Sequence, residues 1–149
     1  MEYQNENTEV ISVGVEIENT QTTTIVSKLS VTNSEELAGC KMQIADTEGN
    51  VIVSWVSGNK DSIQLNEKLD TMGYCNVSVT LDEKGNLQIN GLLHDTTYVL
   101  IENRPADGFV TADSISFQLI EGENKQTLVS VVTGEDMAVQ QDNIVRMVD

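Results

Sequence analysis

The chain has 149 residues, enough for one ordinary domain with some additional sequence at one end. Its formal charge of −16, from 24 acidic and 8 basic side chains, repels phosphate backbones and anionic headgroups, so the charge argues against nucleic-acid and membrane-surface partners. Hydrophobic residues make up 39% of the chain, which allows a core, but no apolar stretch is long enough to span a bilayer.

The N-terminal segment differs in character from the rest of the chain. "MEYQNENTEV" lacks the basic start and apolar run of a signal peptide, so the chain is either cytoplasmic or a piece of a longer secreted protein. Residues 1–21 hold one strand pattern, "VISVGVEIE", which runs through "ENTQ" into the next strand without a compact turn. This arrangement is typical of a boundary between tandem domains, and an additional edge strand explains it equally well.

From residue 22 onward, almost every segment alternates apolar and polar side chains with the period of two that half-buried strands show. Gly-Asn pairs in "DTEGNV" and "DEKGNL" supply the positive φ values that tight hairpins require. Only "NSEELAG" has the composition of a short helical turn, and "GEDMAVQQ" is ambiguous. The pattern predicts an all-β sandwich or barrel, with strands near residues 10–18, 22–31, 40–46, 51–56, 74–81, 86–90, 97–103, 114–120, 127–133 and 143–149.

Three ionisable residues, Lys28, Glu102 and Asp149, each share the face of a predicted strand with the apolar residue two positions earlier. Both faces of the strand in "YVLIENR" are apolar, so this strand is expected to be buried on both sides. Taken alone, each of the three is explained as a residue at the end of a strand whose side chain reaches solvent.

Taken together, the three residues predict a chemistry. An amine and a carboxylic acid in contact in a dry core both shift toward their neutral forms, and a neutral lysine is a nucleophile. A carboxyl group that stays protonated polarises a target carbonyl and transfers a proton to the departing water. With Glu102 in that role, fixed proximity would drive one self-catalysed turnover, an amide bond between Lys28 Nζ and Asp149 Cγ.

Several ordered motifs resemble one family. "IVSKLSV" followed by "ELAGC", then "YVLIENRPADGF", and finally "IVRMVD" are similar to the Cna protein B-type (SpaA-like, prealbumin-like) domains of Gram-positive surface adhesins and pilins. The resemblance implies an immunoglobulin-like (prealbumin-like) β-sandwich over residues 22–149. The chain departs from the family pattern at Cys40, where a small alanine is usual, and at Pro105, which is shifted by one place. Residues 58–90 are also longer than in compact members and add a hairpin, "YCNVSVTLDEKGNLQI".

The resemblance also assigns roles. Lys28 matches the family's reactive lysine, Glu102 its catalytic glutamate and Asp149 its acceptor, with water as the by-product. Asn143 shares the strand face of Asp149 and is the alternative acceptor if the strand register differs. Residues 1–21 would then be a linker or the closing strand of a preceding repeat, with Asn19 as the acceptor for that repeat.

The sequence therefore predicts a non-enzymatic structural repeat of a cell-surface adhesin or pilin-like protein, extracellular and wall-anchored as part of a longer chain. Its expected partners are neighbouring repeats of the same polypeptide. A second hypothesis is a ligand-binding module that uses residues 58–90 to contact a host extracellular-matrix protein or a glycan. A third is a hydrolase built on Glu102 and a second carboxylate.

Other chemistry-bearing residues predict no cofactor and no metal site. Cys40 and Cys75 are too far apart in sequence for a metal site, and they are expected to be two separate buried thiols or, in an extracellular chain, a disulfide. His94 has no nucleophile beside it and is expected in a turn. The two acidic Gly-Asn loops lack the spacing of a calcium loop.

Overall fold

The computed structural model describes residues 22–148 except 31, 34, 134 and 135. These residues form strands and two single-turn 3-10 helices, η3 (Asp70–Met72) and η4 (Glu123–Lys125), and no α-helix. The strands are β2 (Thr23–Leu29), β3 (Lys41–Asp46), β4 (Val51–Val56), β5 (Asn59–Leu65), β6 (Ser78–Leu81), β7 (Leu87–Asn90), β8 (Thr97–Arg104), β9 (Ile115–Glu121), β10 (Thr127–Thr133), β11 (Asp136–Val139) and β12 (Ile144–Val148).

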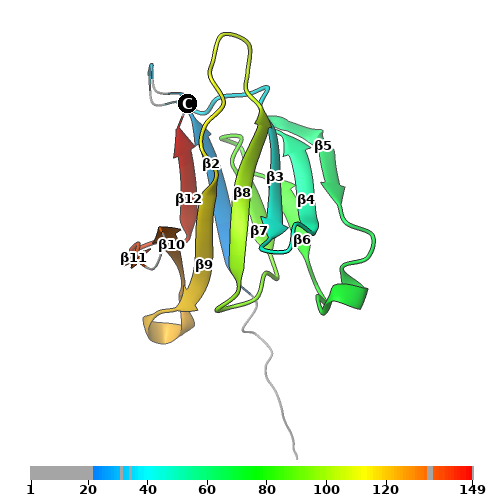
Figure 1. Ribbon diagram of the computed structural model, residues 1–149, viewed down its shortest axis with the longest axis vertical. Helices are drawn as coiled ribbons and strands as arrows, with labels where there is room; N and C mark the ends of the chain where they lie inside the picture. The colour runs from blue at the N-terminus through cyan, green and yellow to red at the C-terminus, as the bar shows by residue number, and fades with distance from the viewer. Residues whose placement is uncertain (1–21, 31, 34, 134–135, 149) are drawn as a thin grey trace, which may run out of the picture.

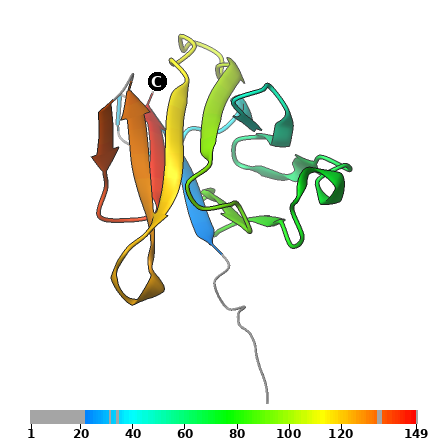
Figure 2. The same ribbon diagram turned by 60° about the horizontal axis from the view of Figure 1, so that its bottom comes forward.

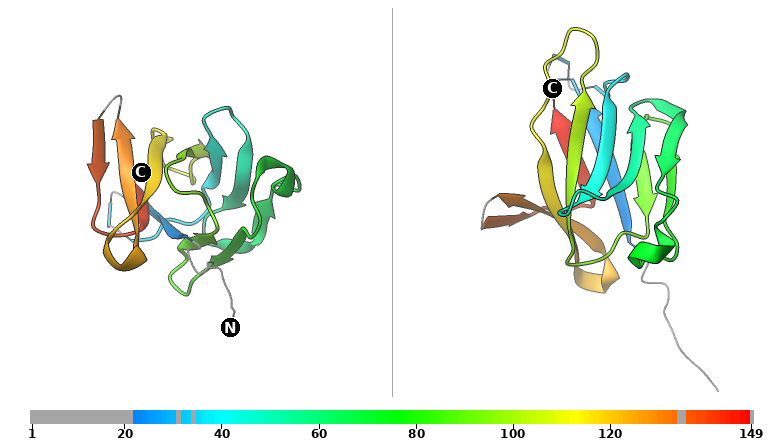
Figure 3. Two further views of the ribbon diagram at one scale, coloured as in Figure 1. Left: turned by 90° about the horizontal axis from the view of Figure 1, so that it is seen from below. Right: turned by 45° about the vertical axis from the view of Figure 1, so that its right-hand side comes forward.

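The strands pack as two sheets, and the expected all-β sandwich is confirmed (Figure 1). One sheet has the order β11-β10-β9-β8-β3-β4-β5, and the other has the order β12-β2-β7-β6. Seen from below, the strands β9 to β11 and the pair β2 and β12 lie in separate layers (Figure 3). The strand β11 lies at one margin of the molecule, and β5 with η3 lies at the other (Figure 2).

Two predicted hairpins form as expected. In the turn between β3 and β4, Gly49 has φ 88°, and in the turn between β6 and β7, Gly85 has φ 89°. Asp46 stabilises the first turn by accepting hydrogen bonds from the backbone N–H groups of Glu48 and Asn50, each at 2.9 Å. Because the carboxylate oxygen is used to hold the turn, this loop is structural.

The longer region between β4 and β8 contributes to both sheets, because β5 is the edge of the larger sheet and β6 and β7 belong to the smaller one. The β6–β7 hairpin was predicted, and β7 pairs with β2, so that its Leu87 and Ile89 enter the core. The edge strand β5 was not predicted. The segment "NSEELAG" forms no helical turn in its described residues and instead makes a single bridge between Leu29 and Glu36.

The core lies between the two sheets. On β8, Tyr98 and Leu100 are fully buried, whereas Val99 and Ile101 are only half-buried. The strand is therefore buried on one face and not on both, which corrects the expectation from its apolar sequence. The Tyr98 hydroxyl accepts a hydrogen bond from Leu93 N–H at 2.9 Å, so the polar tip of the largest fully buried side chain is satisfied.

The feature that matters most for function is the pair β2–β12. These strands lie side by side and run parallel (Figure 1). Their register pairs Val145 with Val26 and Met147 with Lys28. The beginning and the end of the domain are thus adjacent in the same sheet. None of the described helices is long and apolar enough to cross a membrane.

Candidate functional site

The structure brings together two of the three ionisable residues that the sequence singled out. Lys28 comes from β2 in the smaller sheet and Glu102 from β8 in the larger one, and the two side chains meet between the sheets. Lys28 Nζ lies 3.4 Å from Glu102 Oε2, and the side chains are 3% and 0% exposed. The alternation rule placed both correctly: each follows its apolar neighbours into the core.

Glu102 is held at both oxygens. Its Oε1 accepts a hydrogen bond of 2.7 Å from the backbone N–H of Ala112, in the loop between β8 and β9. Its cross-strand partner on β3 is the buried Met42, next to a register shift in that strand. The backbone of the loop therefore orients one oxygen while the other faces the amine, which positions the carboxyl group for proton transfer.

Lys28 is fixed through its backbone. Its carbonyl accepts a hydrogen bond of 2.7 Å from Leu37 N–H, and its own N–H donates to Glu36 Oε1 at 3.2 Å. The second oxygen of Glu36 accepts a hydrogen bond from the Ser27 hydroxyl. Sequence reasoning missed this role of Glu36 because it interpreted the segment as a helical turn. In the sequence, the only indication of this contact was an acidic residue, Glu36, directly before the apolar Leu37.

The proposed acceptors differ in their relation to the site. Asp149 and Asn19 lie outside the described residues. On β12, Val145 and Met147 are buried and Arg146 and Val148 are exposed, so the alternation that puts Asp149 in phase with the core is present up to Val148.

The alternative acceptor lies near the other end of the same strand. Asn143 directly precedes β12 and donates a hydrogen bond of 2.7 Å from Nδ2 to the Thr23 carbonyl. The parallel register pairs Met147 with Lys28, so Asn143 lies opposite the beginning of β2.

The arrangement suits chemistry in a dry core. Both side chains of the pair are removed from water, which carries a large desolvation cost. A hydrolase requires solvent at its carboxylates, and the Glu102 side chain has no exposed surface. The described residues contain no cluster of three or more side chains that would hold a metal ion.

The two cysteines are free and lie in different environments. Cys40 is buried and Cys75 is exposed, so only one of the two separate buried thiols is found. Burial raises the pKa of the Cys40 thiol, and the neighbouring Glu102 carboxyl raises it further. Both effects disfavour the thiolate, which is the reactive form.

This difference gives a testable result. A thiol-specific disulfide reagent is expected to titrate Cys75 alone in the native protein and both thiols after denaturation. The variant Cys75→Ser should give no native signal. Two titratable thiols in the native protein, or none after denaturation, would contradict this assignment.

Comparison with known proteins gives the family. Residues 21–136 match the family model described as SpaA, prealbumin-like fold domain. The shaft pilin SpaA from Lactobacillus rhamnosus GG is 19% identical with a TM-score of 0.51, over 93% of this chain and 50% of that chain. BcpA, the major pilin subunit of Bacillus cereus, is 13% identical with a TM-score of 0.42, over 87% and 28% of the two chains. No curated protein matches the chain.

The structural similarities, at these identities, concern the fold, and the chain spans about half the length of the shaft pilin. The family match is independent of them and covers most of the domain. It agrees with the sheet arrangement and with the motifs in the sequence. The chain belongs to the SpaA family of prealbumin-like fold domains.

Proposed function

We propose that this domain is a structural repeat of a Gram-positive cell-surface adhesin or pilin-like protein, extracellular and wall-anchored as part of a longer chain. An isopeptide bond between Lys28 and Asp149, catalysed once by Glu102, makes the repeat rigid. The observation that carries the proposal is the buried contact between Lys28 and Glu102, directly beside the parallel pair β2–β12. The pilins of similar fold motivate the surface role.

The proposed reaction is a condensation. The neutral Lys28 amine attacks Cγ of Asp149, while protonated Glu102 hydrogen-bonds the carboxyl oxygen and polarises it. Glu102 supplies its proton to the departing Asp149 hydroxyl and, as a carboxylate, then takes a proton from Nζ. The C–N bond forms, the Cγ–O bond breaks, one water leaves, and Glu102 ends protonated again. Water is excluded from the pair, so it does not compete with the Lys28 amine for the Asp149 carbonyl.

The register of β12 favours Asp149 over Asn143 as the acceptor. Val148, the residue before Asp149, pairs with Leu29, the residue after Lys28. Asn143 precedes the strand by one residue and belongs to the opposite end of β2, on the order of 13 Å away along the strand. We therefore propose Asp149 as the acceptor.

The alternative function, a module that binds a host matrix protein or glycan through residues 58–90, has less support. The hairpin in this region contributes β7 to the second sheet and Leu87 and Ile89 to the core. This hairpin therefore stabilises the sandwich, and the exposed surface of the region includes β5 and β6, the terminal strands of the two sheets.

Intact mass of the denatured protein tests the cross-link. The wild-type chain, extended beyond Asp149 by a few residues to prevent fraying, is expected to weigh one water less than its sequence. Lys28→Ala and Glu102→Ala should each have the full mass. Lys41→Ala removes an exposed lysine on β3, the strand that pairs with β8, and should keep the mass deficit of one water. A full mass for the wild type would end the proposal, and loss of ammonia in Asp149→Ala would move the acceptor to Asn143.

A further inference from the structure

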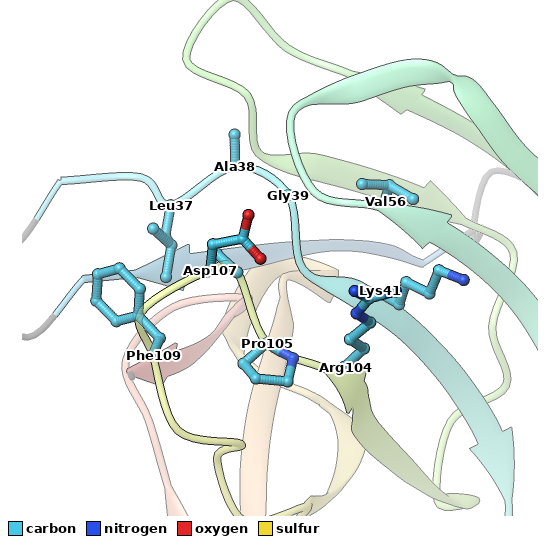
Figure 4. Close-up of a pocket in the computed structure, with 10 residues that line it drawn as sticks. Leu37, Ala38, Gly39, Lys41, Val56, Arg104, Pro105, Asp107 and Phe109 are labelled. Atoms are coloured by element: carbon cyan, nitrogen blue, oxygen red, sulfur yellow. The ribbon is translucent and has the colours of Figure 1, made fainter.

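A second feature at the same end of the sandwich takes no part in the proposed reaction. It is a pocket of about 490 Å³, which we call the end pocket. Its walls come from the segment before β3, the end of β4, and the end of β8 with the loop that follows. Figure 4 shows Leu37 and Phe109 on one side and Lys41 and Arg104 on the other, with Pro105 below.

Two cations at the end pocket face one another across strands. Lys41 and Arg104 are directly paired in the register of β3 and β8, and both are exposed. Like charges at directly opposed positions are destabilising. The chain has only 8 basic residues against 24 acidic ones, so this pairing is conspicuous.

No described carboxylate lies within ion-pair distance of Lys41 or Arg104. Asp107 also lines the pocket, and it forms no salt bridge with either cation. By contrast, the other arginine, Arg146, pairs with Asp142 at 2.8 Å. The end pocket thus combines apolar walls with two uncompensated positive charges, which suits a ligand carrying both a carboxylate and an apolar side chain.

We propose that the end pocket binds an acidic, extended peptide segment, and that residues 1–21 of a second copy of this domain supply it. Residues 1–21 contain five glutamates and no lysine or arginine, and in "VEIE" the carboxylates alternate with apolar side chains. In an extended peptide the carboxylates and the apolar side chains therefore point to opposite sides, as the cations and the apolar wall lie on opposite sides of the pocket in Figure 4.

The position of the end pocket agrees with this occupant. The end of β8 and the start of β3, which carry lining residues of the pocket, lie at the top of Figure 1, where β12 also ends. The strand β2 begins at the opposite, bottom end. Copies arranged end to end therefore bring the segment before β2 of one copy to the end pocket of the copy below it.

Fluorescence anisotropy with a labelled synthetic peptide of residues 1–21 tests this proposal on the full chain. We expect saturable binding that weakens as salt is added, because the cations are exposed. Lys41→Gln/Arg104→Gln should weaken binding about tenfold. The control Lys84→Gln/Lys125→Gln removes the same charge from exposed positions outside the pocket and should bind like the wild type. A peptide with its five glutamates changed to glutamine should also bind about tenfold more weakly.

Three outcomes would overturn the proposal. These are no binding to the wild-type chain, equal loss in the pocket and control variants, and equal affinity for the glutamate and glutamine peptides. Equal loss in the two variants would mean attraction to net charge without a site. None of the substitutions touches Lys28, Glu102 or Asp149, so the mass deficit of the cross-link is read independently in the same samples.

Discussion

The variant Asp149→Ala is expected to lose about 5 kcal/mol of unfolding free energy relative to the cross-linked wild type. The proposed bond closes a loop of about 120 residues, from Lys28 on β2 to the residue after β12. Closing so long a loop restricts the unfolded chain, and the stabilisation grows with the logarithm of loop length. The substitution removes this restriction and leaves the contact between Lys28 and Glu102 in place.

Urea denaturation measures this effect. Because the cross-linked unfolded chain is more compact, Asp149→Ala should increase the dependence of unfolding free energy on urea as well as lower the midpoint. The control Asp113→Ala, an exposed acid in the loop before β9, should change neither quantity measurably. Equal midpoints for Asp149→Ala and the wild type would show that no covalent bond contributes to stability.

The proposed bond also has a mechanical consequence. The strands β2 and β12 are adjacent and parallel, so a bond between them carries force directly from the first strand of the domain to the last. The other strands of the sandwich then do not carry the applied force. This geometry is what a stalk under shear requires, and it arises because the two ends of the domain meet in one sheet.

Much of the fold follows from the sequence because one-sided burial produces alternation. The predicted hairpins and most strand positions depend on this local signal, and so do the inward positions of Lys28 and Glu102. The edge strand β5 was missed because its side chains are largely exposed and its "NKDSIQL" shows no alternation of burial. It is held by backbone pairing with β4, which leaves little trace in the sequence.

Contacts between distant segments were not predictable from the residues alone. The parallel register of β2 and β12 joins segments more than a hundred residues apart, and only the family resemblance implied that they meet. The carboxylate of Glu36, which holds the backbone of β2 at Lys28, depends on the path of an irregular segment. The pairing of Lys41 with Arg104 likewise depends on the register between β3 and β8.

The buried pair should show strong coupling once the covalent bond is removed. In the Asp149→Ala background, Lys28→Met is expected to cost about 3–5 kcal/mol, because it leaves the Glu102 carboxylate in the core without its counter-ion. Adding Glu102→Gln should recover most of this loss, to within about 1–2 kcal/mol of the background. The neutral amide still accepts the hydrogen bond from Ala112 N–H and carries no charge to desolvate.

Chemical denaturation of the background, both single variants and the double variant gives the coupling free energy. The exposed pair Asp142 and Arg146 is the matched control: its side chains are 40% and 44% exposed, so Arg146→Met should cost less than about 1 kcal/mol. A Lys28→Met chain that fails to fold while the double variant folds supports the same conclusion. Additive losses from the two single variants would contradict it, because they would mean that Lys28 and Glu102 do not stabilise one another in the core.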